Sequence, residues 1–146
     1  EDLNMEKKPK NTATLQTLQN NMLRVIFGFK LQNRVNMKNL REEIKMMSVN
    51  QISVYHTLLE AYNVMRHLSS EQIQMKWKLI ERKYALRSIT KKKLNVPEKP
   101  KLKCLGFTYN GAKLFNMLPL EMKKMEDPNI FKTKTKEWIW ENIPSY

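Results

Sequence analysis

The sequence predicts a mostly α-helical protein with a small C-terminal unit of strand, turn and helix that follows a basic linker. Apolar residues recur every three or four positions in several long segments, which is the spacing of helices with one buried face. The chain has only three glycines, and its glycines and prolines mostly fall between these segments. With 146 residues, 41% of them hydrophobic and 28% charged, the chain can bury a modest core beneath a strongly charged surface.

The first predicted helix follows a charged N-terminal segment. Residues 1–13 contain Pro9 and few apolar side chains, so we expect a flexible arm there. From Thr14 onward, the helical domain that we expect over residues 14–84 begins with an amphipathic helix ending at Gly28. Its apolar stripe consists of Leu15, Leu18, Met22, Val25 and Ile26.

Two further helices are predicted before residue 69. Residues 35–47 carry Leu40 and Ile44 on one side and form a short helix that Asn36 can cap. Ser48 opens a longer helix that runs to about residue 68, because neither Gly nor Pro interrupts it. Its predicted stripe is Ile52, Tyr55, Leu59, Tyr62 and Met65, flanked by Leu58 and Val64.

A last helix of this domain and a basic linker follow. Ser69 and Gln72 have the spacing of a capping box, which predicts a helix to about Tyr84. Residues 85–104 then form the expected linker, where Pro97 and Pro100 oppose helix formation. Residues 82–103 carry nine basic side chains against one acid, a net charge of +8. The nine are Arg82, Lys83, Arg87, Lys91, Lys92, Lys93, Lys99, Lys101 and Lys103.

The C-terminal unit is predicted to span residues 105–146. We expect a short strand over 105–109, a turn or helix start at 110–111, and one or two helical turns that end at Pro119. Asp127 followed by Pro128 predicts the start of a final helix that presents Ile130 among its apolar side chains and ends near Pro144. The residues expected to form the core of this unit are Phe107, Tyr109, Leu114, Phe115, Leu118, Phe131, Trp138 and Ile139.

The net charge of +13 favours polyanionic partners, with nucleic acid first among them. Only six of the 27 basic residues are arginines, and lysine contacts phosphate without the two-pronged geometry that reads bases. We therefore predict contact with the backbone of DNA or RNA without sequence readout, through the nine basic residues named above. The alternatives are a lysine-rich translation of an AT-rich genome and a tether whose lysines only keep it soluble.

The cysteine and histidine content and the absence of known motifs argue against catalysis and against bound metals or cofactors. Cys104 is the only cysteine, so the chain has neither an internal disulfide nor a cysteine zinc site, and we expect an intracellular location, with the nucleus as a candidate compartment. His56 and His67 lie eleven residues apart in one predicted helix, too far to share a metal. There is no phosphate-binding glycine loop or nucleophile motif, and no apolar run of about 20 residues for a membrane span. We expect a protein that is not an enzyme.

Two stretches resemble a known family. Residues 107–119 read FTYNGAKLFNMLP, and residues 131–138 read FKTKTKEW. This order is similar to the C-terminal end of non-LTR retrotransposon polyproteins, downstream of the reverse transcriptase palm. Residues 15–28, LQTLQNNMLRVIFG, resemble the helix that follows the palm, in the thumb or just beyond it. The sequence departs from the pattern at Phe115, where tryptophan is usual, and at Asn21, where a basic residue is common.

The resemblance implies a region that helps to hold template or target nucleic acid and that lacks the catalytic palm. The chain opens at Glu1, as expected of a segment of a longer protein or of a processed form. A nucleic-acid-binding module derived from a retroelement, as a remnant co-opted by its host, is thus the first hypothesis. The alternative is a structural scaffold that docks a larger protein complex through apolar helical faces.

Overall fold

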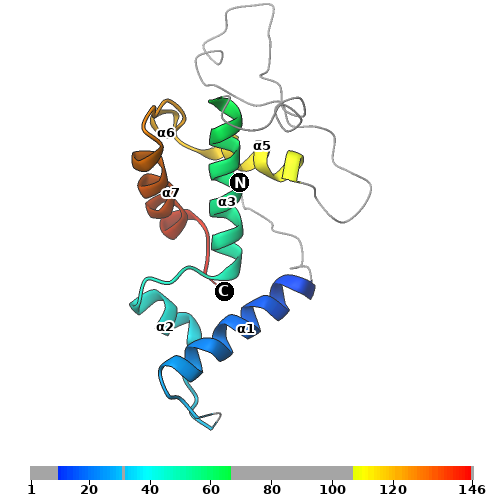
Figure 1. The fold of residues 1–146 in the computed structure, drawn as a ribbon, viewed down its shortest axis with the longest axis vertical. Coiled ribbons are helices and arrows are strands. Elements are labelled where there is room, and N and C mark those ends of the chain that lie inside the picture. Colours follow the sequence, from blue (N-terminus) through cyan, green and yellow to red (C-terminus); the bar gives the residue numbers. More distant parts are fainter. Residues whose placement is uncertain (1–9, 31, 67–106, 146) are drawn as a thin grey trace, which may run out of the picture. The chain divides into compact units, whose positions relative to one another are not determined.

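The computed structural model describes residues 10–30, 32–66 and 107–145, and within these ranges the protein is all-α, as predicted. Contacts divide the chain into two compact units, residues 1–53 with 140–146 and residues 54–139. The helices, shown in Figure 1, are α1 (Lys10–Ile26), α2 (Met37–Glu43), α3 (Val49–Met65), α5 (Phe107–Met117), α6 (Leu120–Lys123) and α7 (Pro128–Asn142). The predicted linker lies outside the described ranges, and the predicted domain boundaries stay predictions.

Helix α1 begins at Lys10, inside the predicted arm, and ends at Ile26, close to Gly28, as predicted. Gly28 has a φ of 68°, a left-handed conformation that L-residues other than glycine adopt at a cost. The backbone N–H of Phe29 donates to the carbonyl of Arg24, and the N–H of Gly28 donates to that of Val25. This pair of hydrogen bonds is the Schellman motif, which satisfies the last carbonyls of the helix.

Helix α2 starts at the predicted cap and ends like α1. The Asn36 side chain accepts hydrogen bonds from the backbone N–H groups of Lys38 and Asn39, at 3.1 and 3.2 Å. At the other end the N–H of Met46 donates to the carbonyl of Arg41. Lys45 takes the position that Gly28 holds after α1, with a φ of 54°. A side chain thus stands where glycine is the favoured residue.

Helix α3 opens with a capping box that the sequence reading missed. Ser48 and Gln51 have the same S-x-x-Q spacing as Ser69 and Gln72, which lie outside the described residues. The Ser48 N–H donates to Oε1 of Gln51 at 3.0 Å, and the Gln51 N–H approaches Oγ of Ser48 at 3.4 Å. The Gln51 amide also donates to the carbonyl of Ile143 at 2.9 Å, which fixes the C-terminal segment to the first unit.

The buried face of α3 differs from the predicted stripe. The buried apolar residues of this helix are Val54, Leu58, Ala61, Tyr62 and Val64. Of the predicted stripe, only Tyr62 belongs to that set, while Ile52, Tyr55, Leu59 and Met65 are half-buried. The predicted stripe was wrong: the buried face is shifted from it by about one residue along the helix. Helix α3 is apolar on most sides, so its sequence does not select one stripe.

The predicted strand is helical over its described part. Phe107, Thr108 and Tyr109 lie in the first turn of α5, and the residues before them fall outside the described ranges. A short apolar run does not distinguish a strand from a buried helix. Buried Ala112 and Phe115 lie one turn apart on α5, which gives it an inward face. Helix α6 follows Pro119, which ends the preceding helix as expected.

Helix α7 begins as predicted and supplies three of the expected core residues, Phe131, Trp138 and Ile139. The N–H of Asn129 donates to the Asp127 carboxylate at 2.8 Å, so Asp127 is the predicted cap. The ring of Phe131 stacks on Tyr62 of α3, with centroids 4.1 Å apart. Ile130, which is not among the residues expected to form the core, is exposed. The buried members of the expected core are Phe115, Leu118, Phe131, Trp138 and Ile139, whereas Tyr109 and Leu114 are half-buried.

Hydrogen bonds from α3 hold the turn before α7. The Tyr62 hydroxyl donates to the carbonyls of Met125 and Glu126, at 2.8 and 3.1 Å. Arg66 donates to the carbonyls of Lys124 and Met125. These bonds satisfy carbonyls that no helix pairs. None of the described helices has the length and apolar content to cross a membrane.

Candidate functional site

The nine basic residues predicted to contact nucleic acid all lie outside the described ranges. They are Arg82, Lys83, Arg87, Lys91, Lys92, Lys93, Lys99, Lys101 and Lys103. The structure therefore neither groups them nor separates them. The described part of the chain supplies other cations, and their surroundings decide which of them are available to a ligand.

A basic and aromatic surface lies in the second unit, on α7 and α3. Lys132 and Lys136 are exposed and one helical turn apart, so their side chains are neighbours. The ammonium of Lys136 lies 5.5 Å from the centroid of the Tyr55 ring, and that ring meets His56 edge-on with centroids 5.4 Å apart. Lys134 instead pairs with Glu137 at 2.9 Å. The alternating lysines of residues 132–136 could have predicted this surface from the sequence, because on a helix Lys132 and Lys136 lie on the same side.

Two other cations are buried and serve the fold. The Lys123 ammonium donates to the carbonyl of Asn116 at 3.0 Å and lies 5.8 Å from the Phe115 ring centroid. Arg41 is 1% exposed and donates to the side-chain oxygen of Asn20. Burial lowers the pKa of the Arg41 guanidinium from its ordinary value, and the Glu42 carboxylate opposes that change. Neither cation is open to a phosphate.

Helix α1 packs in its unit through a polar face. Oε1 of Gln16 accepts from the N–H of Val49 at 2.9 Å, and Nε2 of Gln19 donates to the carbonyl of Met47 at 3.0 Å. Asn20 accepts from Arg41, as noted above. Gln16 also donates to the side-chain oxygens of Gln19 and Asn20, at 2.6 and 3.1 Å. These three side chains and buried Leu23 occupy positions i, i+3, i+4 and i+7, so they share one side of the helix.

The apolar stripe predicted for α1 lies on the outer side. We call Leu15, Leu18, Met22, Val25 and Ile26 the apolar row. The exposed fractions of these residues are 53%, 54%, 65%, 81% and 69%, and that of neighbouring Phe27 is 46%. The amphipathic pattern is therefore present, as expected, but its apolar side faces solvent. This is the feature to which the alternative hypothesis, docking through apolar helical faces, applies.

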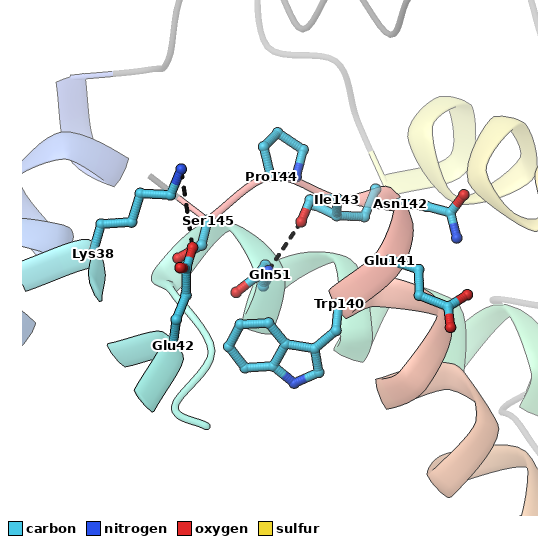
Figure 2. Close-up of a pocket in the computed structure, with 9 residues that line it drawn as sticks. All are labelled: Lys38, Glu42, Gln51, Trp140, Glu141, Asn142, Ile143, Pro144 and Ser145. Atoms are coloured by element: carbon cyan, nitrogen blue, oxygen red, sulfur yellow. Dashed lines mark hydrogen bonds and ion pairs between the residues drawn. The ribbon is translucent and has the colours of Figure 1, made fainter. Parts of the chain in front are cut away.

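A shallow open pocket of about 350 Å³ occurs in the first unit. Figure 2 shows Lys38 beside Glu42, with nitrogen and oxygen 3.9 Å apart, and the side chains of Glu141 and Asn142 pointing away from this pair. The remaining lining residues are Gln51, Trp140, Ile143, Pro144 and Ser145. Both ends of the Gln51 amide are hydrogen-bonded. The buried hydroxyl of Ser145 has no partner among the described residues, but one hydroxyl does not make a ligand site.

In the described part of the chain, no three side chains of His, Cys, Asp or Glu gather as a metal site. His56 is exposed, and His67 lies outside the described residues. No protein-family model, curated protein or solved structure matches the chain. The resemblance to the C-terminal region of retrotransposon polyproteins, like the expectation that the chain is not an enzyme, stays a prediction.

Proposed function

We propose that the chain is a non-catalytic, retroelement-derived module that binds the phosphate backbone of nucleic acid through its lysines. The observation that carries this proposal is the distribution of charge along the sequence. Residues 82–103 hold +8 of the net charge of +13. Such a density of lysine attracts a polyanion through the release of condensed counterions, and it does so for DNA and RNA alike.

The exposed lysines of α7 support the same function. Lys132 and Lys136 add cations, and Tyr55 adds an aromatic face beside Lys136. Cations with aromatic rings form the surfaces that follow a phosphate backbone and stack bases. Lysine supplies a point charge to phosphate, so the proposed binding does not depend on base sequence. The likeness to a nucleic-acid-holding region of retrotransposon polyproteins points in the same direction.

The test is the salt dependence of binding to a heterologous DNA or RNA, measured by fluorescence anisotropy. Changing Lys91, Lys92 and Lys93 together to Gln should flatten the log-log slope by up to about 3, since each phosphate contact on duplex DNA contributes about 0.9. Folding, followed by the circular dichroism of the helices, should barely change. Three lysines in a stretch rich in Pro and Lys are expected to contribute little to the stability of a core.

The matched control changes three exposed lysines elsewhere, Lys30, Lys45 and Lys124, to Gln. It removes the same net charge, so a general field effect would lower both affinities alike. We expect the control to keep the slope of the original chain. An unchanged slope for the Lys91, Lys92 and Lys93 variant would contradict contact through residues 82–103. An equal decrease of the slope in this variant and in the control would contradict it as well.

A further inference from the structure

The apolar row of α1 is the largest gathering of exposed apolar side chains in the described ranges. Six of the large apolar residues that are exposed there lie between Leu15 and Phe27, while Met46, Met117 and Ile130 lie apart from them in sequence. Positions 15, 18, 22 and 25 repeat with helical spacing, so they form one stripe along α1. Single exposed apolar side chains are ordinary, but a continuous stripe of them marks an interaction surface.

The row is exposed on a helix that is already held in place. Gln16, Gln19 and Asn20 attach the other side of α1 to the segment 47–49 and to Arg41. The Schellman motif at Gly28 fixes the end of the helix. Because these bonds leave the row outward, a partner would meet a preformed surface and would not need to unfold it. Preorganisation of this kind lowers the entropic cost of binding.

The charge that adjoins the row in sequence indicates the chemistry of the partner. From Lys10 to Arg41 the sequence contains no aspartate or glutamate. The basic residues in this span are Lys10, Arg24, Lys30, Arg34, Lys38 and Arg41. Lys30 and Arg34, between α1 and α2, are exposed and can attract a negative partner, whereas Arg41 is buried and Lys38 faces Glu42 at 3.9 Å. A second copy of the chain would bring the same positive charges against them, at a net charge of +13. Nucleic acid offers little apolar surface with which to cover five aliphatic side chains.

We infer that the apolar row of α1 docks an amphipathic helix of a partner protein whose own apolar stripe is bordered by aspartate or glutamate. Two helices of this kind pack by interdigitating their side chains along the stripe. Burial of the apolar row supplies the affinity, and the acidic borders select this partner over basic helices and speed its approach. This docking goes beyond the proposed nucleic-acid binding and uses other residues.

The test uses two designed 18-residue helical peptides with the same leucine stripe, one bordered by glutamate and the other by lysine. Each is labelled with fluorescein and titrated with the full chain. The glutamate peptide should bind at least 10-fold more tightly than its lysine twin. The double variant Leu18→Gln with Met22→Gln, which leaves net charge unchanged, should weaken that binding at least 10-fold. Thr17→Gln, an exposed neighbour on another side of α1, should change it less than 2-fold.

Each contrary result identifies what would be wrong. Equal binding of both peptides, or of the original chain and the double variant, would overturn the inference, as would no binding of either peptide. Sedimentation equilibrium that shows a dimer, lost in the double variant, would mean that a second copy covers the row. Binding to anionic vesicles that requires Leu18 and Met22 would mean that a lipid surface does. The slope of nucleic-acid binding against salt should be the same in the double variant, so the two proposals fail separately.

Discussion

The substitution Gln51→Glu would turn a buried amide into a titratable reporter of two hydrogen bonds. When protonated, the introduced carboxyl can replace the amide, since its carbonyl oxygen can accept from the N–H of Ser48 and its O–H can donate to the carbonyl of Ile143. When ionised, it places a negative charge against the Ile143 oxygen at a position that is only 1% exposed. Burial and the facing carbonyl both favour the protonated form and raise the pKa of the introduced group.

The expected loss of stability follows from that rise. If the pKa of the introduced carboxyl rises by about two to three, the free energy of unfolding falls by about 3–4 kcal/mol. Because the folded-state pKa lies above the unfolded value of about 4.3, the variant should approach the original stability below that pH. Its stability relative to the original chain should then fall as the pH rises through the folded-state pKa, and the full deficit should be present above it.

The assay is urea unfolding followed by far-ultraviolet circular dichroism, at several values between pH 4 and pH 8, for the original chain and two variants. Gln51→Leu is the control, because it loses both hydrogen bonds at every pH. Its deficit should be about 2–4 kcal/mol, from two unpaired backbone groups, and should not vary with pH. If Gln51→Glu followed the original chain across the whole range, the amide would be neither buried nor bonded as described.

Two further predictions concern the helix ends and the core. Gly28→Ala should cost about 1 kcal/mol, because the added Cβ meets no atom within 4 Å and only the left-handed backbone opposes it. Lys45→Gly should stabilise the chain by about 0.5–1 kcal/mol, because it removes a side chain from the same kind of backbone position. Thermal unfolding that gave both changes the same sign would refute this reasoning. Trp138→Ala should cost about 3–5 kcal/mol in chemical unfolding, whereas Ile130→Ala on the same helix should stay within about 1 kcal/mol; similar losses would mean that Trp138, 9% exposed, is not part of a packed core.

The elements that the sequence predicted well are those that neighbouring residues decide. Asn36 and Asp127 cap helices because a short polar side chain reaches backbone N–H groups two or three residues ahead. Gly28 ends α1 because it alone adopts a positive φ without strain. Each of these outcomes rests on about six neighbouring residues or fewer, and no distant part of the chain is needed to produce it.

The elements that it predicted poorly depend on distant partners. Which face of α3 is buried follows from the Phe131 ring that stacks on Tyr62 and from the turn at Met125 that Tyr62 holds, both more than 60 residues away. The segment 107–109 is helical because α5 continues through it, which a short apolar run alone does not reveal. The pocket combines α2, the start of α3 and the C-terminal segment, so no local pattern could have predicted it. The nine predicted contact residues lie outside the described ranges and stay predictions.

Helix α1 shows how a correct pattern can predict the wrong side of a helix. Periodic apolar residues normally mark the face that a fold buries, yet here Gln16, Gln19 and Asn20 face inward and the apolar row faces outward. The inner contacts are hydrogen bonds to backbone and side-chain groups, so the polar side chains of this face have their partners. Rotating the helix to bury the apolar face would break these hydrogen bonds. An apolar stripe that the described residues do not bury retains the composition of a buried surface. The physical argument for a partner on α1 is therefore this mismatch between its sequence pattern and its burial.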